Sequence, residues 1–366
     1  MRIIISGGGT GGHIFPAIAI ANALKKINSS TEILFVGAAG RMEMEKVPAA
    51  GYKIEKLWIS GLQRRLTFGN FLFPIKVLLS IIKARMIIKN FKPDVAVGTG
   101  GYASGPLLHV ASVRKIPCLI QEQNSFPGIT NKILSRKVNK ICVAYDGMEK
   151  YFPKEKIIVT GNPVRQDILL LKGKKQGAMD FFKLDPKKKT LFVMGGSLGA
   201  RTINESILRC LDLLVKNNIQ LIWQTGKGFF AVAKETVKKY ETNEIRVFDF
   251  ISRMDLSYAA ADIVVSRAGA IAISELAVAK KPAILIPSPN VAEDHQTKNA
   301  MALVKHDAAI LIKDAEAKEK LGEEIIRLMN DTLLQNKIIE NINKFTFPDA
   351  AETIAKEIIN LVKDKK

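Results

Sequence analysis

The sequence predicts an α/β fold built as two Rossmann-like domains with parallel sheets. Short β-branched runs alternate with helix-length amphipathic stretches, the pattern of parallel strands joined by crossover helices. This rhythm restarts near the middle of the chain, and each half opens as strand, glycine loop and helix. A length of 366 residues leaves room for a core in each half.

The expected strands are apolar runs bounded by turn-forming or charged residues. In the first half they are Ile3–Ser6, Ile33–Val36, Val95–Val97, Cys118–Ile120, Lys140–Val143 and Ile157–Val159. In the second half they are Leu191–Met194, Leu221–Gln224, Arg246–Phe248, Ile263–Val265, Ala283–Ile286 and Ala309–Ile312.

The domain boundary is expected near residue 163. Asn162-Pro163 favours a turn, and the polar, Lys-rich run LKGKKQGAMD that follows is typical of a linker. This assigns 1–163 to an N-terminal domain and 164–345 to a C-terminal domain. The last helix, within 346–366, could belong to either domain, including by packing back on the first.

The net charge of +20 is unevenly distributed. Residues 1–163 hold 23 basic and 9 acidic side chains, a net charge of +14, against +6 in residues 164–366. Between Lys56 and Pro93 there are eight basic residues and no acidic one. Such an excess indicates an anionic partner, either nucleic acid or a membrane surface.

The remaining composition argues against several classes of site. The three cysteines are few and far apart, which favours buried thiols in a reducing cytoplasm over disulfides. The four histidines form no ligand spacing, so no metal site is expected. The opening residues lack the pattern of a signal peptide, and no apolar run is long enough to predict a membrane span.

Three glycine loops each follow an apolar strand and precede a helical pattern: SGGGTGGH (6–13), GTGGYASGP (98–106) and MGGSLGAR (194–201). Glycine lets the backbone turn sharply and a ligand approach closely, and a helix N-terminus offers unpaired N–H groups. The loops therefore favour anion binding, most often of phosphate, over tight packing without a ligand.

A nicotinamide dinucleotide is a weaker interpretation of the first loop. Gly7, Gly9 and Gly12 fit G-x-G-x-x-G, but the second strand ends FVGAAGR, so Arg41 is its first charged residue. An NAD site needs an acidic residue there to hold the ribose, whereas an NADP site could use such an arginine. The arginine therefore counts against NAD more than against every dinucleotide. A Walker P-loop is absent, because Gly226-Lys227 is followed by Gly228.

His13 ends the first glycine loop. It could simply cap the helix, yet the carboxyl ends of parallel strands are where ligands bind in such folds. An imidazole that titrates near neutral pH suits a general base, and this role is favoured for His13.

Seven motifs in order resemble the MurG family and span nearly the whole chain. They are GGGTGGHIFP (7–16), GTGGYASGP (98–106), QEQNSFPGITNK (121–132), TGNPVR (160–165), GGSLGAR (195–201), RAGAIAISELA (267–277) and DHQTKNA (294–300). The resemblance implies a GT-B glycosyltransferase, in which two parallel sheets face across a cleft. It also implies inverting transfer of N-acetylglucosamine from UDP-GlcNAc to the 4-hydroxyl of N-acetylmuramic acid in lipid I, which forms lipid II for peptidoglycan.

The resemblance assigns roles residue by residue. On the acceptor side it implies Thr10, Gly11, Gly12 and His13 near the diphosphate or the attacking hydroxyl, with Gly9, Gly100, Gly101, Tyr102 and Ser104 in the adjoining loops. On the donor side it implies that Asn124 and Gln296 hold sugar hydroxyls beside His295, and that Ser197 contacts the UDP phosphates. It places Arg165 at the hinge near the nucleotide, and Phe250 and the backbone of Ile251 against uracil. It also implies that Ala270 and Ile271 lie along the nucleotide and that Glu275 accepts from the ribose.

Two positions depart from the family pattern. Leu198 stands where Gln is usual, and Ala272 stands where Thr is common. Each change removes a polar contact to the nucleotide phosphates, so donor affinity is the property most affected.

The segment 68–91 is apolar on more than one helical face. Ile75, Leu79 and Ile82 share a face, and Lys76, Lys83 and Arg85 interrupt the stretch. Taken alone this fits an ordinary core helix with solvated lysines. With a lipid-linked acceptor implied, it favours peripheral docking on an anionic membrane surface at the cytoplasmic face of the cell membrane.

The expected activity is therefore a hexosyl transfer that needs no cofactor and no metal, since the chain has no Asp-x-Asp pair. One alternative is a related UDP-sugar:lipid transferase of the diacylglycerol type, which would consume no lipid I. Another is a UDP-GlcNAc epimerase, which would turn over the donor without an acceptor. A basic nucleic-acid-binding protein is disfavoured, because the basic cluster lies among aliphatic rather than stacking aromatic residues.

Overall fold

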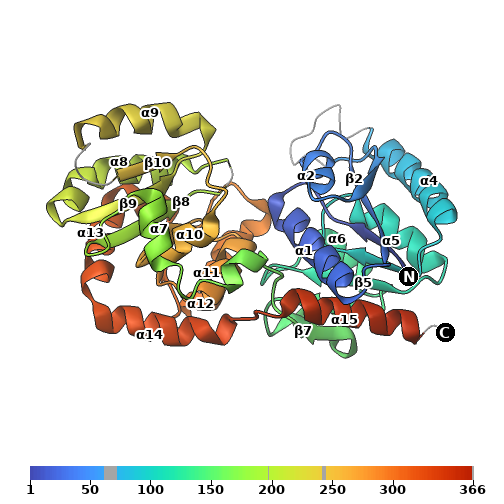
Figure 1. Ribbon diagram of the computed structural model, residues 1–366. Helices are drawn as coiled ribbons and strands as arrows, with labels where there is room; N and C mark the ends of the chain where they lie inside the picture. The colour runs from blue at the N-terminus through green and yellow to red at the C-terminus, as the bar shows by residue number, and fades with distance from the viewer. Residues whose placement is uncertain (62–71, 197, 241–244, 365–366) are drawn as a thin grey trace. The chain divides into compact units, whose positions relative to one another are not determined.

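The structure is a computed structural model that describes residues 1–61, 72–196, 198–240 and 245–364. The chain divides into two compact units (Figure 1). Unit 1 comprises Met1–Val164 and Phe347–Lys366, and unit 2 comprises Arg165–Thr346.

Unit 1 is built on a seven-stranded sheet in which every pairing is parallel. Its strands are β1 (Arg2–Ser6), β2 (Glu32–Ala38), β3 (Lys53–Leu57), β4 (Val95–Gly98), β5 (Cys118–Glu122), β6 (Lys140–Val143) and β7 (Ile157–Val159). Their spatial order is β3-β2-β1-β4-β5-β6-β7. Because the order reverses between β1 and β4, the loops after these two strands flank a crevice where ligands bind in such folds.

Unit 2 repeats the plan with six parallel strands. They are β8 (Lys189–Met194), β9 (Ile219–Gln224), β10 (Ile245–Phe248), β11 (Ile263–Ser266), β12 (Ala283–Leu285) and β13 (Ile310–Leu311), in the order β10-β9-β8-β11-β12-β13. The order reverses between β8 and β11, which makes the loops after these strands the equivalent ligand edge.

These sheets confirm the predicted fold class, and each predicted strand is present. β3 was not predicted. Its sequence KIEKL places charges at three of five positions, and it lies at the edge of the sheet beside β2. An edge strand tolerates charged side chains because part of it faces solvent, so it lacks the apolar run that marks a buried strand.

Helices lie between the strands of both units, and three more, α13, α14 and α15, follow the last strand. In unit 1 they are α1 (Gly11–Ile27), α2 (Glu43–Ala49), α4 (Phe73–Phe91), α5 (Ser104–Val113), α6 (Ile129–Leu134) and α15 (Ala350–Lys363). In unit 2 they are α7 (Lys175–Phe182), α8 (Arg201–Lys216), α9 (Lys227–Val237), α10 (Met254–Ala260), α11 (Ala270–Ala279), α12 (His295–Val304), α13 (Ala317–Asn330) and α14 (Thr332–Ile342).

The last helix, α15, packs on α1 within unit 1 (Figure 1). Ile354 and Ile358 are fully buried in the same core cluster as Ile14 and Ile20 of α1. Burying such a side chain contributes about 1.5–3 kcal/mol relative to leaving it exposed. Ion pairs also join α15 to Lys26 of α1, through Glu352 at 2.7 Å, and to Lys140 of β6, through Glu357.

The three cysteines, Cys118, Cys142 and Cys210, are buried and unpaired. Burial raises the pKa of each thiol to about 12, so all three are protonated at neutral pH. The expectation of buried thiols is confirmed.

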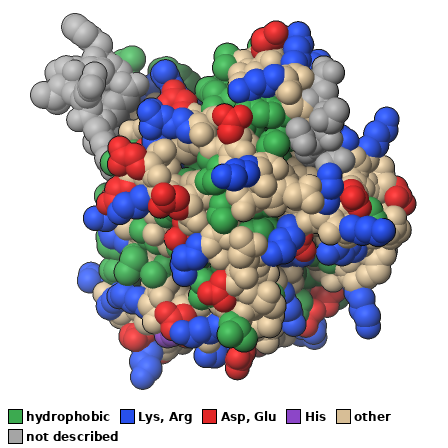
Figure 2. All heavy atoms as spheres, turned by 90° about the vertical axis from the view of Figure 1, so that its left-hand side faces the viewer, with side chains coloured by type: hydrophobic (Ala, Val, Ile, Leu, Met, Phe, Trp, Pro, Cys, Tyr) green, Lys and Arg blue, Asp and Glu red, His purple; other side chains and the backbone are tan. Residues whose placement is uncertain are grey.

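The surface of unit 2 seen in Figure 2 mixes acidic with basic side chains. On α8 and α13, Glu205 pairs with Arg201 and Lys318, and Glu324 pairs with Arg327. Within the described ranges, no helix is both long and apolar enough to cross a membrane.

Candidate functional site

The first glycine loop of unit 1 is joined to the second at the point where the strand order reverses. Thr99 Oγ1, just after β4, donates to the His13 carbonyl oxygen at 2.8 Å. The buried Ser104 Oγ lies 2.9 Å from both the Ser6 and the Gly100 carbonyl oxygens. The loops after β1 and β4 therefore form one connected structure at the ligand edge of the sheet.

Gly100 and Gly101 must be glycine for two reasons. Both have left-handed φ values, +99° and +87°. A Cβ on Gly100 would lie 2.9 Å from His13 Nε2, and one on Gly101 would lie 2.3 Å from the Gly8 carbonyl oxygen. The second loop thus packs directly on the imidazole and on the backbone of the first loop.

His13 lies in the first turn of α1 and is half-buried. Its Nδ1 is 2.9 Å from the Gly8 carbonyl oxygen and 3.4 Å from Thr10 Oγ1. A carbonyl oxygen only accepts, so Nδ1 carries the proton and Nε2 holds the lone pair of the neutral ring. Nε2 is then the nitrogen able to act as a base.

Glu43, on the first turn of α2, contacts the first glycine loop, which the sequence did not predict. Its side chain is fully buried, and its carboxylate accepts from the Gly9 N–H at 3.0 Å and from the Ala38 N–H at 2.9 Å. The Gly9 N–H is therefore already used within the protein. Arg41, the first charged residue after the second strand, lies two residues short of Glu43.

Asn124 is positioned by a second buried carboxylate, that of Glu122 at the end of β5. Glu122 accepts from the Asn124 N–H at 3.0 Å, from Asn124 Nδ2 at 3.1 Å and from the Gly128 N–H at 3.0 Å. The neighbouring Gln123 Nε2 donates to the Thr99 carbonyl oxygen at 2.6 Å. These bonds connect the Asn124 loop to the second glycine loop.

The other predicted acceptor-side residues lie around this cluster. Thr10 and Tyr102 are exposed, with 47% of Tyr102 accessible, and Gly11 and Gly12 open the first turn of α1. Unit 1 therefore brings together Gly9, Thr10, Gly11, Gly12, His13, Gly100, Gly101, Tyr102 and Ser104 on two adjoining loops.

In unit 2, Gln224 at the end of β9 joins the third glycine loop to the predicted uracil site. Its Nε2 donates to the Gly196 carbonyl oxygen at 3.1 Å, and its Oε1 accepts from the Ile251 N–H at 2.9 Å. The Ile251 N–H is thus engaged by a side chain, while Phe250 beside it is 54% exposed. Ser197 lies outside the described residues, and the adjacent Leu198 is 87% exposed.

Glu275 of α11 is buried and held by two side chains. Arg165 Nε lies 3.1 Å from its Oε1, and the Tyr258 hydroxyl donates to its Oε2 at 3.1 Å. Burial raises the pKa of Glu275, opposed by the Arg165 charge. Ala270 and Ile271 begin the same helix, so the structure brings Arg165, Ala270, Ile271 and Glu275 together at the loop after β11.

His295 and Gln296 form the first turn of α12. Gln296 Oε1 accepts from the Ser288 N–H at 2.8 Å, which fixes the amide against the loop after β12. The two residues before the helix, Glu293 and Asp294, have left-handed φ values of 54° and 50°. This region is uncommon for non-glycine residues, although aspartate adopts it more often than most.

The predicted membrane-facing residues lie on α4. Ile75, Leu79 and Ile82 are 50%, 43% and 44% exposed. Lys76 contacts the ring of Trp58 and donates to Ser60 Oγ, and Lys83 pairs with Glu55 at 3.5 Å. Arg85 is exposed on the same helix, whereas Ser80, Ala84, Ile87 and Ile88 face the core.

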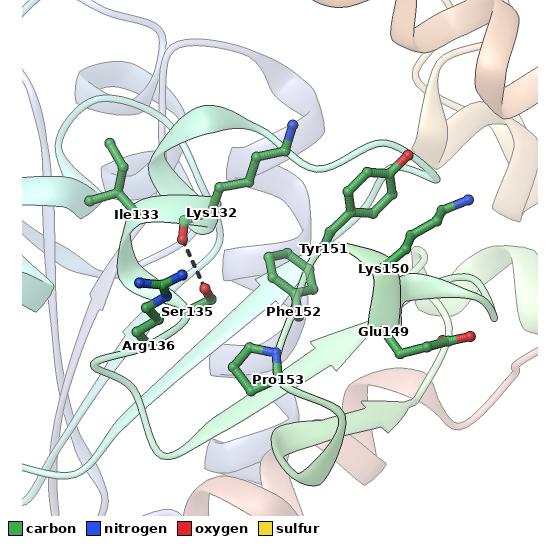
Figure 3. Close-up of a pocket in the computed structure, with 9 residues that line it drawn as sticks. All are labelled: Lys132, Ile133, Ser135, Arg136, Glu149, Lys150, Tyr151, Phe152 and Pro153. Carbon is green, nitrogen blue, oxygen red and sulfur yellow. Dashed lines mark hydrogen bonds between the residues drawn. The ribbon is translucent and has the colours of Figure 1, made fainter.

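A separate surface pocket of about 560 Å³ lies between α6 and the segment before β7 in unit 1 (Figure 3). It is lined by Lys132, Ile133, Ser135, Arg136, Glu149, Lys150, Tyr151, Phe152 and Pro153. None of these is a predicted site residue, so the pocket is distinct from the glycine-loop cluster.

Comparison with known proteins agrees with this geometry. Residues 3–143 match the glycosyltransferase family 28 N-terminal domain, and residues 190–354 match the glycosyltransferase family 28 C-terminal domain. The UDP-N-acetylglucosamine–N-acetylmuramyl-(pentapeptide) pyrophosphoryl-undecaprenol N-acetylglucosamine transferase of Cytophaga hutchinsonii is 56% identical, covering 99% of this chain and 97% of that protein. The enzyme of the same name from Flavobacterium psychrophilum is 54% identical, covering 100% and 99%.

Among solved structures, MurG of Acinetobacter baumannii superposes with a TM-score of 0.77 at 26% identity, covering 98% of this chain and 99% of that one. The fold, the paired domain matches and the full-length identity agree with one another. The chain belongs to the MurG family of UDP-N-acetylglucosamine–N-acetylmuramyl-(pentapeptide) pyrophosphoryl-undecaprenol N-acetylglucosamine transferases.

Proposed function

We propose that this chain transfers N-acetylglucosamine from UDP-GlcNAc to the 4-hydroxyl of N-acetylmuramic acid in lipid I, which forms lipid II for peptidoglycan synthesis. The observation that carries the proposal is the 56% identity, over nearly the full length of both chains, to an enzyme named for this reaction. The His13 geometry in unit 1 supports it.

In the proposed chemistry His13 acts as the general base. Its Nε2 takes the proton of the acceptor 4-hydroxyl while that oxygen forms a bond to C1 of the donor sugar. The bond from C1 to the β-phosphate oxygen breaks, and UDP leaves with the bonding electrons. Attack opposite the leaving group inverts the configuration at C1. A base of this kind contributes about 10²–10⁴-fold to the rate.

The donor is proposed to bind unit 2 at the loops after β8 and β11. The UDP phosphates would lie against the 195–199 loop and the start of α8, where backbone N–H groups and the helix dipole stabilise the departing diphosphate without a metal. Phe250 and Ile251 would contact uracil, and Gln296 and Asn124 the sugar hydroxyls. The ribose hydroxyls would donate to Glu275 in place of Arg165 or Tyr258.

We also propose that the enzyme docks peripherally on the cytoplasmic face of the cell membrane through α4. The supporting observation is a row of half-exposed apolar side chains, in which Leu78 is 60% and Met86 49% exposed beside Ile75, Leu79 and Ile82. Basic residues near an anionic leaflet add about 1 kcal/mol each. Lys76, Lys83 and Arg85 lie on this helix.

Docking is tested by sedimentation with anionic phosphatidylglycerol vesicles. Replacing Ile75 and Leu79 with Asp is expected to reduce the bound fraction at least several-fold, because the apolar face is lost. The matched control is Leu333→Asp on α14, a position that is 84% exposed in unit 2. An equal loss in both variants would contradict docking through α4.

The activity is tested by transfer of radiolabel from UDP-GlcNAc to a lipid I analogue in the presence of EDTA. Labelled lipid product that requires both substrates is the expected result, with no product from UDP-galactose or without acceptor. Donor turnover without acceptor would indicate an epimerase instead. His13→Ala is expected to lower kcat by about 10²-fold or more; near-normal turnover would reject His13 as the base.

A further inference from the structure

The Gly8–Gly9 peptide group connects a buried carboxylate to the imidazole of His13. Its N–H, on Gly9, donates to Glu43 Oε2 at 3.0 Å. Its carbonyl oxygen, on Gly8, accepts from His13 Nδ1 at 2.9 Å. One planar unit therefore lies between Glu43 and His13, with a hydrogen bond at each end.

We propose that Glu43 is a positioning residue for His13 and acts through this peptide group. The proposal rests on the proposed function, in which His13 Nε2 is the base. A carboxylate that accepts from the N–H increases the negative charge on the carbonyl oxygen, since hydrogen bonds in a chain polarise one another. The Gly8 carbonyl then holds the Nδ1–H tautomer more firmly and stabilises the imidazolium that forms when Nε2 takes a proton.

The surroundings of Glu43 are consistent with this role. The side chain is fully buried and approaches Gly8 and Gly37 so closely that a Cβ on either would fall 2.0 Å from Oε1 or 2.5 Å from Cγ. Both hydrogen bonds to Glu43 come from backbone amides. No lysine or arginine within the described ranges forms an ion pair with it. The Gly9 N–H, in the first glycine loop, therefore holds Glu43 Oε2, and the Ala38 N–H, at the end of β2, holds Oε1.

The test compares Glu43→Gln with Glu45→Gln. Glu45 is on the same helix, but its side chain is 78% exposed and pairs with Lys46. Glutamine keeps the shape of the side chain but has only one accepting oxygen. Its NH₂ group would face one of the two backbone N–H groups, which would lose its hydrogen bond. We expect kcat to fall about 10-fold in Glu43→Gln, the lower end of the loss found when the orienting partner of a metal-bound histidine is removed, with KM for UDP-GlcNAc unchanged. Glu45→Gln should match the wild type.

A loop that is merely loosened could also lower kcat, so the imidazole is observed directly. The ¹⁵N chemical shifts of the His13 ring distinguish the two neutral tautomers. In the wild type the Nδ1–H form should dominate, and Glu43→Gln should increase the Nε2–H fraction. A wild type that is mainly Nε2–H, or a tautomer ratio unaffected by Glu43→Gln, would overturn the proposal.

A double-mutant cycle completes the test. If Glu43 acts through His13, Glu43→Gln should change kcat by less than about 2-fold in the His13→Ala background. An equal loss in both backgrounds overturns the proposal. Should His13→Ala be as active as the wild type, the base assignment fails, yet the tautomer measurement still decides the coupling. If Glu43→Gln does not fold, Glu43→Asp replaces it, with a smaller change expected in the same direction.

Discussion

Two buried glutamates at corresponding edges of the two units are held in different ways. Glu43 in unit 1 accepts from backbone N–H groups of Gly9 and Ala38, whereas Glu275 in unit 2 accepts from the side chains of Arg165 and Tyr258. Backbone donors cannot move away without deforming the loop. Side-chain donors can rotate, and Arg165 is already 37% exposed.

The difference indicates two uses of a buried carboxylate. Glu43 is suited to holding a loop in one conformation, because exchanging its partners would break the Gly8–Gly9 backbone geometry. Glu275 is suited to exchanging its protein donors for the hydroxyl donors of a ligand. We call unit 1, where backbone amides hold the carboxylate, the rigid half, and unit 2, where side-chain donors hold it, the adaptable half.

The largest expected effect comes from breaking the rigid half directly. In Gly101→Ala the new Cβ would lie 2.3 Å from the Gly8 carbonyl oxygen, at a φ of +87°. The Gly8–Gly9 peptide must shift, and a displacement near 1 Å costs about 100-fold in turnover. Transfer assays with lipid I analogue would measure this loss.

The matched control is Gly51→Ala, which has a φ of +84° but no atom within 4 Å of the position that the new Cβ would take. It carries the same backbone strain, about 1–2 kcal/mol, without the clash. Turnover near the wild-type value is expected for it. An equal loss of activity in both variants would show that backbone strain, not contact with Gly8, limits the enzyme.

In the adaptable half, Glu275→Gln should have a smaller effect on activity than Gly101→Ala has in the rigid half. The neutral amide accepts more weakly from ribose hydroxyls, since hydrogen bonds to a charged group contribute about 1.5–3 kcal/mol. We expect KM for UDP-GlcNAc to rise about 10-fold, with little change in KM for the acceptor. Glu235→Gln, at a side chain that is 72% exposed in unit 2, is the control. A fall in kcat with an unchanged KM for UDP-GlcNAc would instead mean that Glu275, like Glu43, holds a loop in place and does not bind the ribose.

The sequence was sufficient for every strand of the two sheets except the charged edge strand β3, because buried parallel strands are continuous apolar runs. It was also sufficient to find the three glycine loops, each of which follows an apolar strand. It was not sufficient for the partners of those loops. Glu43 lies two residues after Arg41, the position where an NAD site would need an acidic residue. Nothing in the sequence shows that the Glu43 oxygens reach the N–H groups of Gly9 and Ala38. Likewise, the engagement of the Ile251 N–H by Gln224 depends on side-chain geometry between neighbouring strands.

The smallest expected effect concerns another buried carboxylate, Asp255 of α10. It tests whether a carboxylate held by side-chain donors always exchanges those donors for a ligand. Its oxygens accept from Arg253 at 2.9 Å and Lys174 at 2.8 Å, and the side chain is only 2% exposed. The hydrogen bond from Arg253, followed by that from Lys174, holds the pKa of Asp255 well below its usual range. Among the described residues its side-chain partners are Arg253 and Lys174, neither of which is a predicted site residue, so we expect its role to be stability alone.

Asp255→Asn is therefore expected to leave both KM values unchanged and to lower the free energy of unfolding by about 1–3 kcal/mol at pH 7, or roughly 5 °C in Tm. Because the pKa is lower in the folded than in the unfolded state, this contribution is fully present above an unfolded pKa of about 3.9 and is lost as pH falls towards the folded value. The difference in Tm between wild type and Asp255→Asn should thus be constant from pH 7 to about 5 and shrink below about pH 4. A difference that persists undiminished at the lowest pH where the protein stays folded would mean that the ionised carboxylate is not what stabilises α10. A higher KM for UDP-GlcNAc would mean that Asp255, like Glu275, exchanges its side-chain donors for groups of the nucleotide.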